Sequence, residues 1–247
     1  MKLDPLKYSL LRIVEIAEKQ WGRAELTSFD RRIKDLYKEL HSEGLITLIR
    51  TSKHWYANLT EDGKKYLEYF RKNIKSIEEI DLEILEDKKR FVKGVKAGLW
   101  ILLVGRHGIG KTYLLEELMK TGKYIFVMGS SAKKEYILLI KNFAKRFGFG
   151  ILVDELDKMH MTVQDALLDV YYDSVQVIAT ANDKRKIQPH IYSRFDLVID
   201  INMSYEVYKR LLEKNGVSLP ENKVRELYES GVDIRKVVRL YRANLLD

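Results

Sequence analysis

One glycine-rich segment of the chain has the residue types and spacing of a phosphate-binding loop. Residues 105–112 read Gly-Arg-His-Gly-Ile-Gly-Lys-Thr and lie between an apolar run at 99–104 and an amphipathic run at 113–119. Glycines allow backbone turns in which consecutive N–H groups converge on phosphate oxygens. The lysine adds a point charge for the β- and γ-phosphates, and the threonine hydroxyl can coordinate Mg²⁺. The pattern predicts a strand, a phosphate loop and a helix that together bind ATP and Mg²⁺.

The whole loop and the residue after it are expected to contact the nucleotide. We assign this role to Gly105, Arg106, His107, Gly108, Ile109, Gly110, Lys111, Thr112 and Tyr113. The side chains of Arg106 and His107 occupy variable positions of the motif, so we expect them to contribute nothing essential.

Two further polar positions follow apolar runs. Asp154 and Glu155 end the run 149–153, where Asp154 can reach Mg²⁺ opposite Thr112 and Glu155 can polarise the attacking water. Asn182 follows the run 175–180 and can orient that water. The alternatives are a turn that begins at the two carboxylates and a helix or turn cap at Asn182.

These motifs occur in an order that resembles the AAA+ ATPase superfamily over about residues 77–247. Residues 105–112 match its Walker A loop, residues 151–158 its Walker B strand, and Asn182 its sensor 1. Residues 191–196 resemble the segment that carries the arginine finger, and residues 231–236 resemble the sensor 2 helix.

The resemblance implies a division of labour among these residues. Lys111, Thr112 and Asp154 would hold Mg·ATP, with Thr112 and Asp154 as the metal ligands. Arg235, from a small helical lid, would reach the same nucleotide. Arg194 would act in a neighbouring subunit, so full activity would need an oligomer. A surface salt bridge is the alternative for each arginine.

One departure from the family concerns residues 128–135, which lack the aromatic-apolar-glycine pore loop of protein unfoldases. Polypeptide threading is therefore disfavoured. Lys133 and Lys134 could face a nucleic-acid backbone or begin a solvated helix.

The first part of the chain predicts a different architecture. Its periodicity predicts helices at 5–20 and 29–43, strands at 45–49 and 55–59, and a helix capped by Thr60. This order resembles winged helix-turn-helix domains over about residues 5–72. The resemblance implies duplex DNA binding through basic residues of the second helix and the hairpin tip: Arg31, Arg32, Lys34, Lys38, Arg50, Lys53 and His54. Protein binding, or a merely solvated basic face, is the alternative.

Composition agrees with a polyanionic partner. The chain has 247 residues, 46% of them apolar, a formal net charge of +8 and no cysteine. Residues 1–75 hold 16 of the basic and 11 of the acidic side chains, so this smaller part carries most of the excess charge. Disulfides and cysteine-ligated zinc are excluded, and no run is long enough to span a membrane, so we expect a soluble cytoplasmic protein.

We therefore expect a winged helix-turn-helix domain (1–75), a three-layer α/β P-loop NTPase core of AAA+ type (76–202) and a helical lid (203–247). The segment 73–87 is expected to pack on the core. The expected function is an ATPase that binds DNA and remodels it or loads a partner, in the style of replication initiators, helicase loaders and branch-migration motors. The resemblance to branch-migration motors is to a different domain order, in which the winged domain comes last. An ATP-switched transcription regulator and a remodeller of a protein complex remain alternatives.

Overall fold

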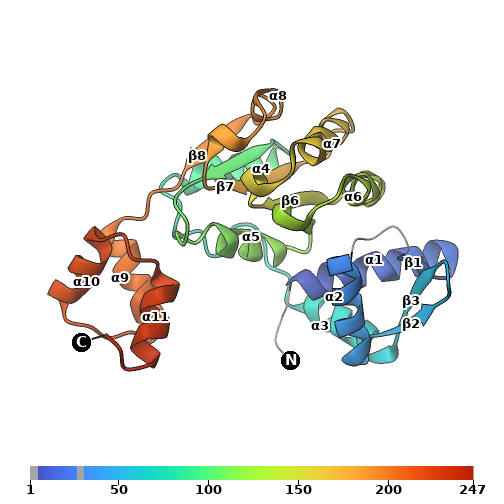
Figure 1. Cartoon of the computed structure of the whole chain (residues 1–247), viewed down its shortest axis with the longest axis horizontal. Coiled ribbons are helices and arrows are strands. Elements are labelled where there is room, and N and C mark those ends of the chain that lie inside the picture. The colour runs from blue at the N-terminus through green and yellow to red at the C-terminus, as the bar shows by residue number, and fades with distance from the viewer. Residues whose placement is uncertain (1–4, 27–30, 247) are drawn as a thin grey trace.

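The computed structural model describes residues 5–26 and 31–246. These residues form a small antiparallel sheet followed by a five-stranded parallel sheet. In Figure 1 the parallel sheet lies in the middle, between the N-terminal elements on one side and a group of C-terminal helices on the other. Within the described ranges, no helix has the length and apolar character needed to cross a membrane.

The N-terminal unit, which we define as the described residues up to 72, combines helices with the antiparallel sheet. Its elements are α1 (Pro5–Trp21), β1 (Ala24–Glu25), α2 (Arg31–Ser42), β2 (Ile46–Arg50), β3 (Trp55–Leu59) and α3 (Glu61–Lys72). The sheet order is β1-β3-β2. The Thr60 side chain accepts a hydrogen bond from the Gly63 amide, so the predicted cap is confirmed. Residues 29 and 30 of the predicted second helix lie outside the described residues.

The middle of the chain alternates helices and parallel strands, as predicted. The elements are α4 (Lys88–Lys96), β4 (Ile101–Val104), α5 (Lys111–Met119), β5 (Tyr124–Met128), α6 (Lys134–Phe147), β6 (Gly150–Asp154), α7 (Met161–Tyr172), β7 (Val177–Ala181), α8 (Pro189–Tyr192) and β8 (Leu197–Asp200), with 3₁₀ turns η1 (Gly129–Ser131), η2 (Leu156–Lys158) and η3 (Lys184–Lys186). The sheet order is β5-β6-β7-β4-β8, and all neighbouring strands are parallel.

Helices cover both faces of this sheet. Alternate strand residues point to opposite faces, so Leu102 and Val153 belong to one apolar cluster with residues of α6 and α7. Ile101 and Leu152 belong to a second cluster with residues of α4 and α5. The connection 73–87 contributes four buried side chains to the second cluster, which confirms that it packs on the parallel sheet.

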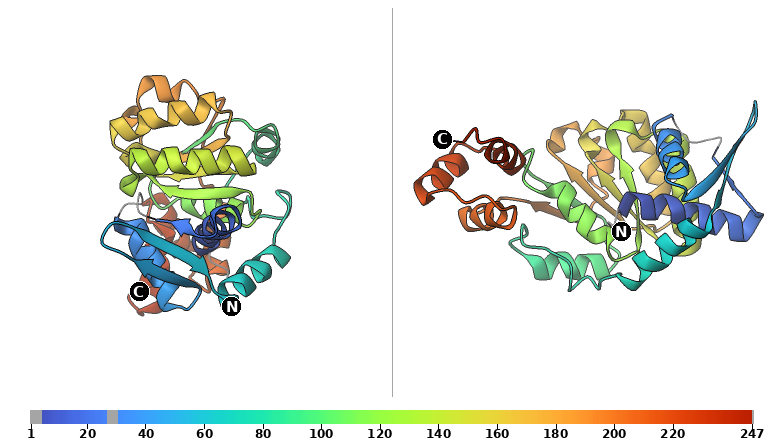
Figure 2. Two further views of the ribbon diagram at one scale, coloured as in Figure 1. Left: turned by 90° about the vertical axis from the view of Figure 1, so that its right-hand side faces the viewer. Right: turned by 90° about the horizontal axis from the view of Figure 1, so that it is seen from below.

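The C-terminal unit, residues 203–246, consists of α9 (Tyr205–Lys214), α10 (Glu221–Glu229) and α11 (Ile234–Arg242). These helices share a separate apolar cluster that includes Tyr208, Leu212 and Val237. Figure 2 shows them beyond the end of the sheet, away from the N-terminal unit.

Candidate nucleotide-binding site

The glycine-rich loop leaves the end of β4 and enters α5. All four β4 residues are buried, and α5 begins at Lys111. Gly108 and Gly110 have φ values of 79° and 96°, a left-handed conformation that a side chain disfavours. At Gly105 a Cβ would lie 2.8 Å from the Ile201 carbonyl oxygen. The loop backbone therefore requires glycine at these positions.

Lys111, the first residue of α5, is buried next to the loop. Its Nζ donates to the carbonyl oxygens of Gly105 and Arg106, both at 2.7 Å, and to Asn182 Oδ1 at 2.9 Å. Burial lowers the pKa of Lys111, and the nearby carboxylates of Asp154, Asp157 and Glu155 oppose that effect. The structure thus brings the predicted loop lysine and the predicted water-orienting amide into direct contact.

A hydroxyl and a carboxylate lie side by side next to this lysine. Thr112 Oγ1 donates to Asp154 Oδ2 at 2.8 Å. Asp154 ends β6 and is 5% exposed. A second hydroxyl, that of Thr180 on β7, donates to Asp154 Oδ1 at 2.5 Å and accepts from the Glu155 amide at 2.9 Å. The sequence reasoning missed Thr180, although a hydroxyl in an otherwise apolar strand was the available signal.

The oxygens of Thr112 and Asp154 match the preference of Mg²⁺ for hydroxyl and carboxylate ligands, which bound phosphates and water complete. Among the described residues, the hydrogen-bond partners of Lys111 Nζ are neutral oxygens, which it can exchange for phosphate oxygens. The residues present therefore fit both ATP and Mg²⁺.

Glu155 occupies an unusual backbone position. Its φ is 56°, in the left-handed region, and its carboxylate Oε1 accepts from Lys158 Nζ at 2.5 Å. Left-handed conformations of residues other than glycine are costly and occur often at functional sites. A catalytic use of this carboxylate would require the Lys158 contact to open.

Asp157 is a further buried acid that the sequence reasoning missed. Its Oδ2 accepts a hydrogen bond from the Asp183 amide at 3.3 Å. Its Oδ1 is buried without a hydrogen-bond partner among the described residues.

A carboxylate of the C-terminal unit contacts the loop. A Cβ built on Gly108 would lie 2.1 Å from Asp233 Oδ2, so the Asp233 side chain rests against this glycine. Asp233 also caps α11 and binds Arg235, whose Nη2 lies 3.2 Å from Oδ2. Burial acts to raise the pKa of Asp233, but the bonds from Arg235 and the charges of Arg235 and His107 lower it.

Tyr113 and the C-terminal unit meet at a second carboxylate. Asp81, in the connection before α4, accepts from Tyr113 Oη at 3.0 Å and from Lys214 Nζ at 2.6 Å. Although burial acts to raise it, the pKa of Asp81 is lowered, chiefly by Lys214. No sequence pattern distinguished Asp81 from other acids of the connection.

Among the described residues, the side chains of Ile109, Arg106 and His107 make none of these hydrogen bonds, although the Arg106 guanidinium lies near Gly231, where an added Cβ would be 3.3 Å from Nη1. Ile109 packs partly buried against the cluster under α5, whereas Arg106 and His107 are exposed.

Arg194 lies at the other end of the sheet. The residue two positions later, Asp196, accepts from the Trp100 amide at 2.8 Å, just before β4 begins. The loop leaves the opposite end of β4, so four strand residues separate the two places, about 13 Å at 3.3 Å each. The structure does not bring Arg194 together with Lys111.

The predicted DNA-contacting residues fall into groups. Lys34, Lys38 and Arg50 surround one indole ring, with their cationic groups 5.5, 5.6 and 4.5 Å from the centroid of Trp55. His54 instead binds Glu25 and stacks on another ring of the hairpin.

The other three predicted contacts are Lys53, Arg31 and Arg32. Lys53 is exposed in the hairpin turn. The side chains of Arg31 and Arg32 lie outside the described residues.

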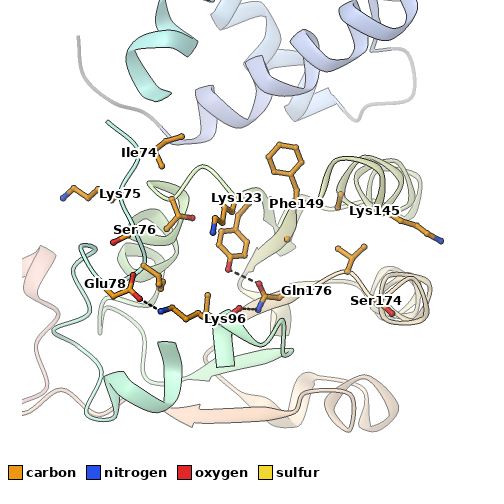
Figure 3. Close-up of a pocket in the computed structure, with 18 of the residues that line it drawn as sticks. Ile74, Lys75, Ser76, Glu78, Lys96, Lys123, Lys145, Phe149, Ser174 and Gln176 are labelled. Carbon is orange, nitrogen blue, oxygen red and sulfur yellow. Dashed lines mark hydrogen bonds and ion pairs between the residues drawn. The ribbon is translucent and has the colours of Figure 1, made fainter. Parts of the chain in front are cut away.

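A cavity of about 780 Å³ lies away from all of these residues, at the N-terminal ends of β5, β6 and β7 (Figure 3). In it, Lys96 pairs with Glu78, and Tyr124 donates to Gln176, whose amide donates to Val95 and Leu99 carbonyl oxygens. No predicted site residue lines it.

Comparisons with known proteins bear on the parallel sheet. Residues 101–203 match the model of the family described as "ATPase family associated with various cellular activities (AAA)". No protein with curated annotation matches the chain.

Solved structures of similar fold include RuvB of Thermotoga maritima, described as a Holliday junction branch migration motor. It is 17% identical, with a TM-score of 0.50, over 70% of this chain and 64% of that one. A proline-to-glycine variant of the same protein is 19% identical over 57% and 53% of the two chains, with a TM-score of 0.47. The chain thus spans between half and two thirds of these structures, and the likeness concerns the fold alone.

The matched segment contains the loop, Asp154, Asn182 and Arg194, and it extends to the first residue of the C-terminal unit. Residues 101–203 are therefore an AAA ATPase domain, and ATP and Mg²⁺ are the cofactors of that domain.

Proposed function

We propose that this ATPase binds duplex DNA through its N-terminal unit and uses ATP binding and hydrolysis to remodel DNA or to load a partner on it. In this proposal residues 1–75 are a winged helix-turn-helix domain, residues 76–202 the nucleotide-binding core and residues 203–247 a lid. The protein works as an oligomer.

At the nucleotide, each residue has a distinct task. Lys111 and the loop amides grip the phosphates, while Thr112 and Asp154 hold Mg²⁺, which neutralises phosphate charge. Asn182, already in contact with Lys111, orients the attacking water. Glu155 takes a proton from that water once Lys158 releases it, and Arg235 reaches the nucleotide from the lid after parting from Asp233.

Binding and hydrolysis can be separated by two variants. Lys111→Ala should lose ATP binding, because the only ammonium group of the loop is removed. Glu155→Gln should retain ATP but hydrolyse it about 10²–10⁴-fold more slowly, as expected when a general base is removed. Equilibrium binding of labelled ATP and phosphate release measure the two effects. A Lys111→Ala protein that turns over at the parental rate would refute the assignment.

Arg194 acts on the nucleotide of a neighbouring subunit. Its distance from the loop of its own chain, most of the length of β4, supports this assignment. Arginine fingers supplied by a second protein accelerate phosphoryl transfer by about 10³-fold or more. Arg194→Ala should therefore lower the turnover number at protein concentrations that allow assembly, while ATP affinity stays the same.

The cluster around Trp55 is the observation that carries the DNA proposal. Lys34 and Lys38 come from α2, and Arg50 comes from the end of β2, yet all three face one ring. A helix and a hairpin tip thus present a single cationic surface. Such a surface fits the phosphate backbone on either side of a groove that α2 could enter.

The N-terminal fold adds support with one difference from the usual pattern. The sheet order β1-β3-β2 with helices before and between its strands is typical of winged helices. Among the described residues only α2 stands between β1 and β2, where a helix-turn-helix usually has two helices. We assign α2 as the helix that enters the groove.

Fluorescence anisotropy with labelled duplex, single-stranded and forked DNA tests this proposal. The Lys34→Ala, Lys38→Ala, Arg50→Ala variant should bind at least about tenfold more weakly. The slope of its salt dependence should fall by about one unit for each phosphate that the protein no longer neutralises. A Lys64→Ala, Lys65→Ala variant is the control, because these lysines lie on α3, outside the cluster around Trp55. Equal binding by the first variant would refute the assignment of this surface.

ATP turnover measured with the same DNAs distinguishes a DNA remodeller from a transcription switch and from a remodeller of protein complexes. A DNA remodeller should hydrolyse ATP faster with its preferred DNA. A transcription switch should hydrolyse slowly and ignore DNA, and a remodeller of protein complexes should show no salt-dependent DNA binding.

A further inference from the structure

The side chain of Arg194 is held by an aromatic ring rather than by an acid. Its guanidinium carbon lies 5.2 Å from the ring centroid of Tyr171 on α7. Among the described residues no carboxylate pairs with Arg194, and its buried Nε has no hydrogen-bond partner. A buried donor without a partner is rare in native proteins and calls for an explanation.

The ring under Arg194 is itself fixed. Tyr171 packs edge-on against the indole of Trp100, with centroids 5.4 Å apart and planes at 84°. Trp100 is 4% exposed, and its Nε1 donates to the Val175 carbonyl oxygen at 2.8 Å. Phe195 also packs against this indole, with ring centroids 5.4 Å apart. The ring therefore rests on the rigid start of the parallel sheet.

An aromatic ring that holds the Arg194 guanidinium affects its charge differently from a carboxylate. A carboxylate would neutralise the guanidinium and compete with any phosphate that approached it. A ring face attracts the cation through its quadrupole but leaves the charge and the outward N–H groups available. It also limits the rotamers of a long side chain before the reaction, and a charge that is oriented in advance contributes most to catalysis.

We propose that Tyr171 is a positioning residue that presents Arg194 to the nucleotide of a second copy of this chain. The inference rests on the proposed role of Arg194 and adds the residue that makes that arginine effective. Tyr171 is 36% exposed, so the arrangement lies at the surface, where a second copy can reach it.

ATP turnover by three variants of the assembled protein tests the role of the ring. Tyr171→Leu keeps apolar bulk but removes the ring face, and the turnover number should fall about tenfold with KM for ATP unchanged within about twofold. Tyr171→Phe keeps the face and should stay within about twofold of the parent. Tyr69→Leu is the matched control, because Tyr69 lies on α3 with a similar exposed fraction of 40%.

Mixing two defective proteins distinguishes positioning from a structural role. Lys111→Ala subunits cannot bind ATP but carry an intact Tyr171 and Arg194, whereas Tyr171→Leu subunits have an intact nucleotide site. In mixed oligomers the Lys111→Ala subunits supply an intact Arg194 to the nucleotide sites of the Tyr171→Leu subunits. The turnover number per Tyr171→Leu subunit should therefore be several-fold higher than in oligomers of Tyr171→Leu alone. Mixtures of Tyr171→Leu with Arg194→Ala should regain nothing.

The outcomes distinguish failure of the inference about Tyr171 from failure of the role proposed for Arg194. Slow turnover by Arg194→Ala with parental turnover by Tyr171→Leu would overturn the inference and leave the role of Arg194 intact. Parental turnover by Arg194→Ala would overturn both. A Tyr171→Phe protein as slow as Tyr171→Leu, or mixtures with Lys111→Ala that stay slow, would also overturn the inference. Tyr171→Met, which has a more flexible apolar side chain, replaces Tyr171→Leu if that variant does not fold.

Discussion

The N-terminal and C-terminal units contact the parallel sheet in different ways. Residues of α1 belong to the same apolar cluster as residues of β5, α6 and α7. Ser9 Oγ also lies 3.9 Å from Met119 Sδ at the end of α5, and Trp21 packs edge-on against Phe143 of α6 at 6.0 Å. The N-terminal unit thus shares a core with the ATPase domain, and it touches the helix that begins at the phosphate loop.

The C-terminal unit has a core of its own and meets the rest of the protein mainly through polar side chains. Lys214 binds Asp81, Arg210 lies 3.4 Å from Glu83, and Asp233 rests on Gly108. From α9, two side chains, Val207 and Leu211, add partly buried apolar contact. Exposed ion pairs are weak and exchange readily with water. We therefore expect the C-terminal unit to change its position relative to the sheet more readily than the N-terminal unit does.

The largest expected effect comes from Ile13, which lines the α1 junction and is 4% exposed. Ile13→Ala should lower the free energy of unfolding of the sheet by about 3 kcal/mol, because a large side chain is removed from a shared core. Urea unfolding followed by Trp100 fluorescence, with Trp21 and Trp55 replaced by Phe, reports the sheet alone.

A matched substitution in the other unit sharpens this test. Leu212 is 1% exposed within the cluster of the C-terminal unit. Leu212→Ala should unfold those helices earlier but move the Trp100 transition by less than about 0.5 kcal/mol, as for a distant, independent site. Equal shifts of the Trp100 unfolding transition by Ile13→Ala and Leu212→Ala would contradict the difference between the two units.

A middle-sized effect is expected at Gly108. Gly108→Ala places a Cβ against Asp233 and also strains a backbone with φ 79°, which costs about 1–2 kcal/mol. ATP affinity should fall about tenfold, measured by equilibrium binding. Gly108→Ala with Asp233→Ala should recover part of the loss, because the clash is removed and the strain remains. No recovery would mean that the C-terminal unit does not press on the loop.

The smallest effect is expected at Asp81. Asp81→Asn removes one ion pair whose lysine is exposed and whose carboxylate is partly buried. It should change the free energy that holds the C-terminal unit in place by less than about 1 kcal/mol. The chain has no cysteine, so dyes on Lys236→Cys and Lys88→Cys can report the distance to α4 by energy transfer. High salt should reproduce the variant's change. A dye pair on Lys72→Cys and Lys88→Cys should show no change with salt.

The dye pair at positions 236 and 88 also measures how the distance between α11 and α4 depends on pH. The pKa of Asp81 is lowered from its ordinary 3.8 and that of Lys214 is raised from 10.5. The ion pair is therefore complete between these two ordinary values. It breaks as pH falls through the lowered pKa of Asp81 or rises through the raised pKa of Lys214. A distance change between pH 5 and 9 would contradict this assignment.

Much of the fold could be predicted, because each signal lies within a short segment. The glycines of the loop, the apolar runs before Asp154 and Asn182, and the cap at Thr60 each depend on neighbouring residues. Short elements such as β1 could not be predicted, since two residues carry no periodicity. The roles given to individual site residues remain predictions until the variants above are measured.

The sequence by itself determined the backbone chemistry of the loop, the strand and helix pattern and the basic character of the first part. Only the tertiary structure decided which distant residues meet. Thr180 binds Asp154, Asp81 joins Tyr113 to Lys214, and the ring of Tyr171 supports Arg194. The physical reason is that turns and periodicity follow from local backbone preferences. Contacts between distant residues depend on strand register and helix packing, which are fixed by the whole core.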